Sequence, residues 1–77
     1  MNKVRRKQLR LAMELLEQAQ SIIEEVRDEE QEAFDNMPEG LPCSERGEQM
    51  EEGIYNIEEF LDSLSDMVEG ITDIVEV

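Results

Sequence analysis

The stretch MEEGIYNIEEFLDSLSDMVEGITDIV, residues 50–75, carries the strongest structural signal in the chain, because its apolar residues recur every seven positions. Three such series run side by side through it: Met50, Ile57, Leu64 and Ile71; Phe60, Met67 and Ile74; and Ile54, Leu61, Val68 and Val75. A seven-residue apolar period predicts a helix that packs in a left-handed, nearly parallel manner against another helix. Because three of every seven positions are apolar, the predicted stripe is wider than the seam of a two-stranded coiled coil.

The N-terminal part of the chain carries a second helical pattern, over about residues 3–36. With Leu9 at position a of a heptad, the a positions are Leu9, Leu16, Ile23, Glu30 and Met37, and the d positions are Ala12, Ala19, Val26 and Ala33. Leu15 and Ile22 widen this stripe at position g. Glu30 is the one charged residue among these named positions, so the pattern predicts a single long helix.

A turn-rich stretch, NMPEGLPCSERG at residues 36–47, separates the two patterns. Pro disfavours helix at its own position and at the residue before it, so Pro38 and Pro42 predict a loop over about residues 37–44. Ser44 is a good helix N-cap, and Glu45 and Glu48 follow it in the first turn, where the helix dipole favours negative charge. The second helix is therefore predicted to span about residues 45–75.

Two long helices joined by a short loop predict an all-α fold, an antiparallel two-helix hairpin of coiled-coil type, in one domain over residues 1–77. A chain of 77 residues buries only a thin core, and one Cys with no His gives it neither a disulfide nor the common metal sites. One hairpin cannot cover both sides of so wide a stripe. We therefore expect a homodimer in which two hairpins form a four-helix bundle, and a larger oligomer is the alternative.

The charge of the chain is extreme for its length. It has 21 Asp and Glu against 7 Lys and Arg, a net charge of -14. Such a field repels nucleic acid and anionic membranes and attracts basic proteins, so the predicted partner is a basic nucleic-acid-binding protein. Neither a membrane-spanning run nor a signal-type apolar core follows the basic start MNKVRRKQLR, and we expect an intracellular, cytoplasmic protein.

The candidate partner-binding surface is the polar side of the second helix. Between Gly47 and Val77 there are ten acids and no base. The residues predicted to contact the partner are Glu51, Glu52, Tyr55, Glu58, Glu59, Asp62, Asp66 and Glu69. Helical geometry aligns these acids into a rod of negative charge whose density is coarsely similar to that of the phosphates of a nucleic-acid duplex, with Tyr55 as an aromatic anchor. The alternative is a solvated face that only keeps the protein soluble.

Five of the seven basic residues stand at the start of the first helix, and acids crowd its later half. The five are Lys3, Arg5, Arg6, Lys7 and Arg10. Both placements oppose the helix dipole. Antiparallel folding brings the basic start beside Asp73 and Glu76, which predicts mutual neutralisation within the hairpin. A phosphate-binding patch is the alternative.

The sequence contains no motif that is typical of an enzyme active site or of a metal-binding site. The chain has no His, and Cys43 stands alone in the loop, so we predict no enzyme, no metal site and no cofactor, and an inert Cys43. The segment DNMPEG, residues 35–40, is not a calcium loop, because the twelfth position is Arg46 where a bidentate acid is required. Gly53 stands at a core position, which suggests close helix contact near the loop, with Phe34 packed in the same place.

The segment RDEEQEAFDNMPEGLPCSERGEQMEE, residues 27–52, and the acidic heptads after it resemble small uncharacterised proteins of phages and prophages of Gram-positive bacteria. The resemblance implies a mobile-element origin and a role in the bacterial host cell as an anti-CRISPR or anti-restriction inhibitor. A CRISPR effector nuclease is then the favoured partner, because its nucleic-acid channel is basic. The alternatives are a self-assembling structural or regulatory bundle, and an oligomeric sponge that captures a nucleotide signal through Arg5, Arg6 and Arg10.

Overall fold

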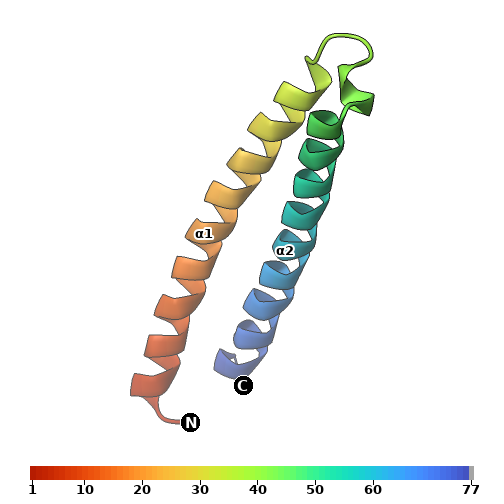
Figure 1. Ribbon diagram of the computed structural model, residues 1–77. Coiled ribbons are helices and arrows are strands. Elements are labelled where there is room, and N and C mark those ends of the chain that lie inside the picture. The colour runs from red at the N-terminus through yellow and green to blue at the C-terminus, as the bar shows by residue number, and fades with distance from the viewer. Residues whose placement is uncertain (77) are drawn as a thin grey trace.

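The computed structural model describes residues 1–76 and has two long antiparallel helices packed side by side (Figure 1). Helix α1 spans Lys3–Asp35, the short 3-10 helix η1 spans Leu41–Cys43, and helix α2 spans Glu45–Val75. The hairpin is a rod of 58 × 14 × 13 Å. The first turn of α1 and the last turn of α2 lie at one end, here called the open end, and η1 lies at the loop end. The predicted all-α hairpin is confirmed.

The helix ends follow local chemistry. The Asn2 side chain caps α1 by accepting from the Arg5 backbone N–H at 2.9 Å, and Ser44 Oγ caps α2 by accepting from the Gly47 N–H at 3.2 Å. After α1 the chain turns at Gly40, whose φ of +90° suits a residue without a Cβ. The Ser44 cap and both predicted helices are confirmed, with α1 ending one residue before the predicted 36.

The core of the hairpin is one line of side chains along α2. Ile54, Leu61 and Val75 are only 6%, 5% and 4% exposed, and they belong to one of the three seven-residue series. On α1, the half-buried residues that share positions a and e of the heptad are Leu9, Met13, Leu16, Gln20, Ile23, Arg27, Glu30 and Phe34. Since only these three apolar residues of the described chain are buried, the core is as thin as the chain length predicts.

Part of the stripe predicted on α1 lies outside this core. Val26 and Ala33 at position d, and Leu15 and Ile22 at position g, are exposed. The reason is the rotation of α1, which turns the e positions toward α2. There the Gln20 side chain donates to Ser65 Oγ at 3.0 Å. These exposed positions agree with the expectation that one hairpin cannot cover so wide a stripe.

Gly47 is the glycine at which a larger residue would clash with neighbouring backbone atoms, and no sequence pattern predicted this. Gly47 is buried, and a Cβ built on it would lie 2.6 Å from the Leu41 carbonyl oxygen and closer still to that of Pro42. Gly47 lets η1 fold back onto the first turn of α2. At Gly53 an added Cβ would meet nothing within 4 Å, so the expectation of close helix contact at Gly53 is wrong within the hairpin.

Replacing Gly47 with Ala is expected to lower the free energy of unfolding by about 1–3 kcal/mol, because the new methyl group meets backbone atoms that cannot rotate away. Gly70→Ala is the control, since nothing lies within 4 Å of its added Cβ and Ala gains up to about 1 kcal/mol over Gly in a helix. Urea unfolding followed by circular dichroism measures both. Equal effects of the two substitutions would contradict the packing of η1.

Candidate functional site

All eight residues predicted to bind a partner are exposed on α2. Successive residues of a helix lie about 100° apart, so the eight fall within roughly a third of its circumference. They are Glu51, Glu52, Tyr55, Glu58, Glu59, Asp62, Asp66 and Glu69. We call this surface the acidic side of α2. It faces away from the apolar residues Phe60, Met67 and Ile74, so the structure keeps the predicted site residues together on one surface.

The carboxylates of this surface are not neutralised by cations of the same chain. Within residues 1–76, the one ion pair closer than 4 Å joins Arg27 Nη2 to Asp28 Oδ1 at 3.1 Å, and both residues belong to α1. The acids on α2 therefore keep their full field toward solvent. This is the property that a surface needs if it is to attract a basic partner.

At the open end, the structure brings the basic start beside the acids of α2 (Figure 1) but forms no direct ion pair between them within the part of the chain that it describes. Neither Asp73 nor Glu76 forms an ion pair there. Instead, Arg10 Nη2 donates to the backbone carbonyl of Val75 at 3.3 Å. The last carbonyls of a helix lack partners and form the negative end of its dipole. Arg10 thus stabilises the end of α2 through the backbone and leaves the neighbouring carboxylates free.

Helix α1 extends the acidic surface across the hairpin. The hydrogen bond from Gln20 to Ser65 marks the side on which the acids of both helices meet. Residues three or four positions apart are neighbours on a helix. Four acids hold such positions next to Gln20 or Ser65: Glu17, Glu24, Asp62 and Glu69. The acidic surface is therefore broader than the one on α2 that the sequence predicted.

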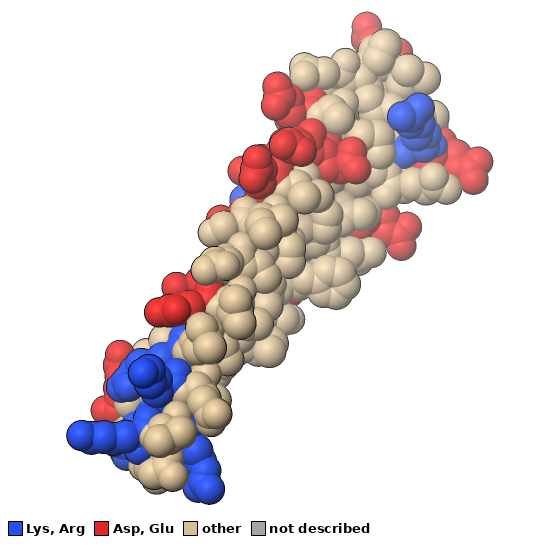
Figure 2. Space-filling view, turned by 90° about the vertical axis from the view of Figure 1, so that its left-hand side faces the viewer, with Lys and Arg blue, Asp and Glu red and all other residues tan. Residues whose placement is uncertain are grey.

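Charge is also divided unevenly along the rod. Residues 20–65, which form the half nearer the loop, have 15 acids and two bases and a net charge of -13. The remaining residues have six acids and five bases and a net charge of -1. Figure 2 shows Lys and Arg gathered at the open end and an uncharged band that continues along the rod. The negative charge of the hairpin is therefore concentrated in the half nearer the loop.

Tyr55 is the one aromatic residue of the acidic side, and it is 60% exposed. Glu59, one helical turn further on, accepts a hydrogen bond from the phenol and holds a negative charge beside it, and both effects raise the pKa of Tyr55 above its ordinary value of 10.0. The phenol is therefore neutral at physiological pH. It offers an apolar ring and a hydroxyl donor in an acidic setting, as an interface anchor does.

The substitution Glu59→Gln is expected to lower the pKa of Tyr55 toward 10.0, because it removes the negative charge that disfavours the phenolate. A raised pKa favours the neutral phenol in the folded state, so its stabilising effect is present below pH 10 and is lost as pH rises through the folded pKa. Ultraviolet titration is clean because the chain has one Tyr and no Trp. An unchanged titration curve would contradict the contact between Tyr55 and Glu59.

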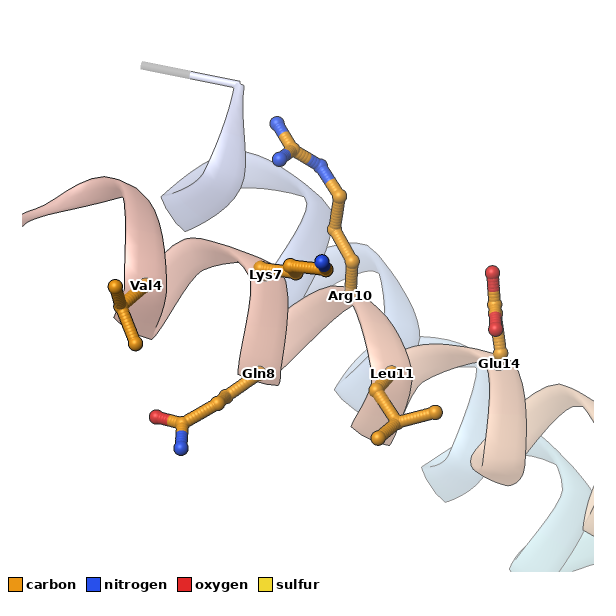
Figure 3. A pocket seen from close by; sticks show the side chains of 6 residues that line it. All are labelled: Val4, Lys7, Gln8, Arg10, Leu11 and Glu14. Atoms are coloured by element: carbon orange, nitrogen blue, oxygen red, sulfur yellow. The ribbon is translucent and has the colours of Figure 1, made fainter.

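The open end carries a basic hollow. Lys3, Arg6, Lys7 and Arg10 line a space of about 370 Å³, and the Nε atom of Arg6 is buried without a hydrogen-bond partner among the described residues. A neighbouring hollow of about 460 Å³ lies on the outer surface of α1 (Figure 3). There Gln8 and Leu11 point away from α2, while Arg10 reaches toward its last turn. The basic start is thus only partly engaged within the hairpin.

Within residues 1–76, no group of three or more His, Cys, Asp and Glu side chains is arranged to hold a metal ion. Neither helix is long and apolar enough to cross a membrane. Cys43 is a free, exposed thiol beside η1. The acidic side of α2 and the basic open end are the two strongly charged surfaces of the described chain (Figure 2).

Comparison of the chain with protein-family models, with curated proteins and with solved structures finds no match.

Proposed function

We propose that this protein is a non-enzymatic, phage-encoded inhibitor of a bacterial defence nuclease, with a CRISPR effector as the favoured target. In this proposal the acidic side of α2 occupies the basic channel through which the nuclease holds nucleic acid. The observation that carries the proposal is the exposed row of carboxylates on α2 that has no ion-pair partner within residues 1–76. A basic channel is attracted to such a row as it is to phosphates.

The density of charge supports mimicry of one nucleic-acid strand rather than of a duplex. Residues 45–76 contain eleven acids. At about 1.5 Å of rise per residue they span roughly 48 Å, or about one charge per 4 Å. One strand of B-DNA carries a charge about every 3.4 Å, and the duplex carries one about every 1.7 Å. The row on α2 therefore resembles a strand backbone more closely than a double helix.

Two further features favour binding over mere solubility. A small domain is kept soluble by a net charge of magnitude about 2–8, and this chain carries -14. In addition, a continuous 31-residue helix holds its carboxylates in a fixed array, which lowers the entropy lost on binding. Tyr55 adds an aromatic contact within that array.

The proposal is tested with two purified nucleases: an RNA-guided CRISPR nuclease loaded with its guide, and a restriction endonuclease. The protein is expected to protect plasmid DNA from at least one of them. The dissociation constant of that complex is expected to rise at least about tenfold between 50 and 200 mM salt, because the contacts are between screened charges. Full cleavage by both nucleases, or a complex insensitive to salt, would contradict the proposal.

A second candidate function, capture of a nucleotide signal, is favoured by the basic hollow at the open end. Its cations and the unpartnered Nε of Arg6 suit phosphate oxygens. Calorimetry with a cyclic dinucleotide separates the two functions. If the protein captures a nucleotide signal, the unaltered chain binds the dinucleotide and the Arg6→Ala variant does not. Inhibition of a nuclease through the acidic side of α2 is expected to survive that substitution.

A further inference from the structure

The hairpin has an unpartnered apolar surface, which we call the apolar side. It consists of Leu15, Ile22 and Val26 on α1 and Phe60, Met67 and Ile74 on α2, each between 48% and 62% exposed. In comparison, only three hydrophobic residues of the described chain are buried. The hairpin alone therefore leaves more large apolar side chains exposed than it buries to below a tenth of their surface, which is costly for a chain with so thin a core.

The two halves of the apolar side lie on one side of the rod. Ala33 of α1 and Met50 of α2 line the same hollow near the loop, so they face the same way. Along α1, Val26 continues the heptad row of Ala33, and Leu15 and Ile22 lie next to that row. Along α2, the row of Phe60 lies beside the row of Met50. The polar contact between Gln20 and Ser65 lies on the opposite side of the interface.

We propose that a second copy of this chain covers the apolar side, with the two rods antiparallel, so that the loop end of each lies against the open end of the other. A stable dimer buries roughly 800 Å² per partner, which is less than a sixth of the 5998 Å² surface of the hairpin. One full side of a rod 58 Å long is large enough to supply that area. The result is a four-helix bundle.

The distribution of charge along the rod favours a second copy of the chain on the apolar side and favours its antiparallel orientation. Parallel rods would place a half with a net charge of -13 against another half with a net charge of -13. Antiparallel rods place each such half against one with a net charge of -1, where five cations gather at the open end. The acids near the loop and the cations near the open end are complementary, which an unrelated partner would match only by chance.

Arg5 supports this arrangement. It stands seven residues before Ala12 and fourteen before Ala19, at position d, so it continues the α1 edge of the apolar side to the open end. Arg5 is exposed in the hairpin. In the antiparallel pair it comes to the loop end of the second copy, where Glu29 and Glu30 lie. The dimer leaves the acidic side of each α2 outward, and it does not depend on the proposed function.

The native cysteine allows a direct test on the unaltered chain. Sedimentation equilibrium is expected to give twice the chain mass of 8.9 kDa. Spin labels on Cys43, the only cysteine, are expected to lie at a distance close to the 58 Å length of the rod. Parallel copies would bring the labels within about 20 Å, because packed helices lie 8–10 Å apart. A chain that stays monomeric at millimolar concentration, or a short label distance, overturns the proposal.

Two aromatic residues of α2 provide a matched pair of variants. Phe60 is 61% exposed on the apolar side and Tyr55 is 60% exposed on the acidic side. Phe60→Glu is expected to raise the dissociation constant of the dimer at least about a hundredfold, because two carboxylates enter an apolar interface. Tyr55→Glu is expected to leave the dimer within about threefold of its original affinity. Equal effects of the two substitutions overturn the assignment of the apolar side.

Discussion

A variant in which four carboxylates of the acidic side of α2 become amides is expected to inhibit the nuclease at least about a hundredfold more weakly. The four residues are Glu58, Glu59, Asp62 and Asp66. Each partly screened contact with a basic partner contributes about 0.5–1 kcal/mol, so four together contribute about 3 kcal/mol. Since about 1.4 kcal/mol is tenfold in affinity, the expected loss is about a hundredfold. The inhibitor concentration that halves DNA cleavage measures it.

The control for this variant changes the net charge equally at another place. Four exposed acids on the outer part of α1 are replaced by Gln: Glu14, Glu25, Glu29 and Glu32. If the row on α2 makes the contact, this control inhibits within a few-fold of the unaltered protein. Equal losses in the two variants would mean that bulk charge, rather than the surface of α2, attracts the nuclease, and no loss in either would remove the electrostatic argument.

The substitution Leu61→Ala is expected to lower the free energy of unfolding by about 2–4 kcal/mol. Leu61 is 5% exposed at the middle of the line formed with Ile54 and Val75, so its removal leaves a cavity between the helices. A hairpin with only three buried hydrophobic residues has few other contacts to compensate. Urea unfolding followed by circular dichroism, at one fixed protein concentration, measures the change.

Tyr55→Ala is the control for Leu61→Ala, because Tyr55 lies on α2 and points to solvent. A surface substitution of this kind changes stability by about 0.5 kcal/mol or less. A loss below about 1 kcal/mol for Leu61→Ala, or a loss equal to that of Tyr55→Ala, would contradict the assignment of the core to this line of residues.

The sequence predicted the secondary structure because its rules are local. The seven-residue series, the prolines at 38 and 42 and the capping Ser44 each act within a few residues along the chain. They placed both helices within one residue of their observed ends. The acidic side of α2 was predictable for the same reason, since the spacing of its acids fixes their angular positions on a helix.

The packing was predicted only in part. The three apolar series of α2 look alike in the sequence, yet Leu61 is buried, Ile57 is half-buried and Phe60 is exposed. On α1, position d belongs to the predicted apolar stripe, yet Arg27 at position e is half-buried while Val26 at position d faces solvent. These differences depend on the rotation of each helix about its axis. That rotation is set by contacts between residues far apart in the chain, and no local spacing reports it.

Local chemistry was enough to predict two helices joined by a short loop, with the acids of the second helix in one sector, because the heptad period, the helix caps and the prolines act over a few residues. The packing of the helices, in contrast, sets which apolar series is buried, lets η1 lie against Gly47, and brings Arg10 to the Val75 carbonyl rather than to a carboxylate. The physical reason is that the register and rotation of two antiparallel helices are collective properties of their whole interface.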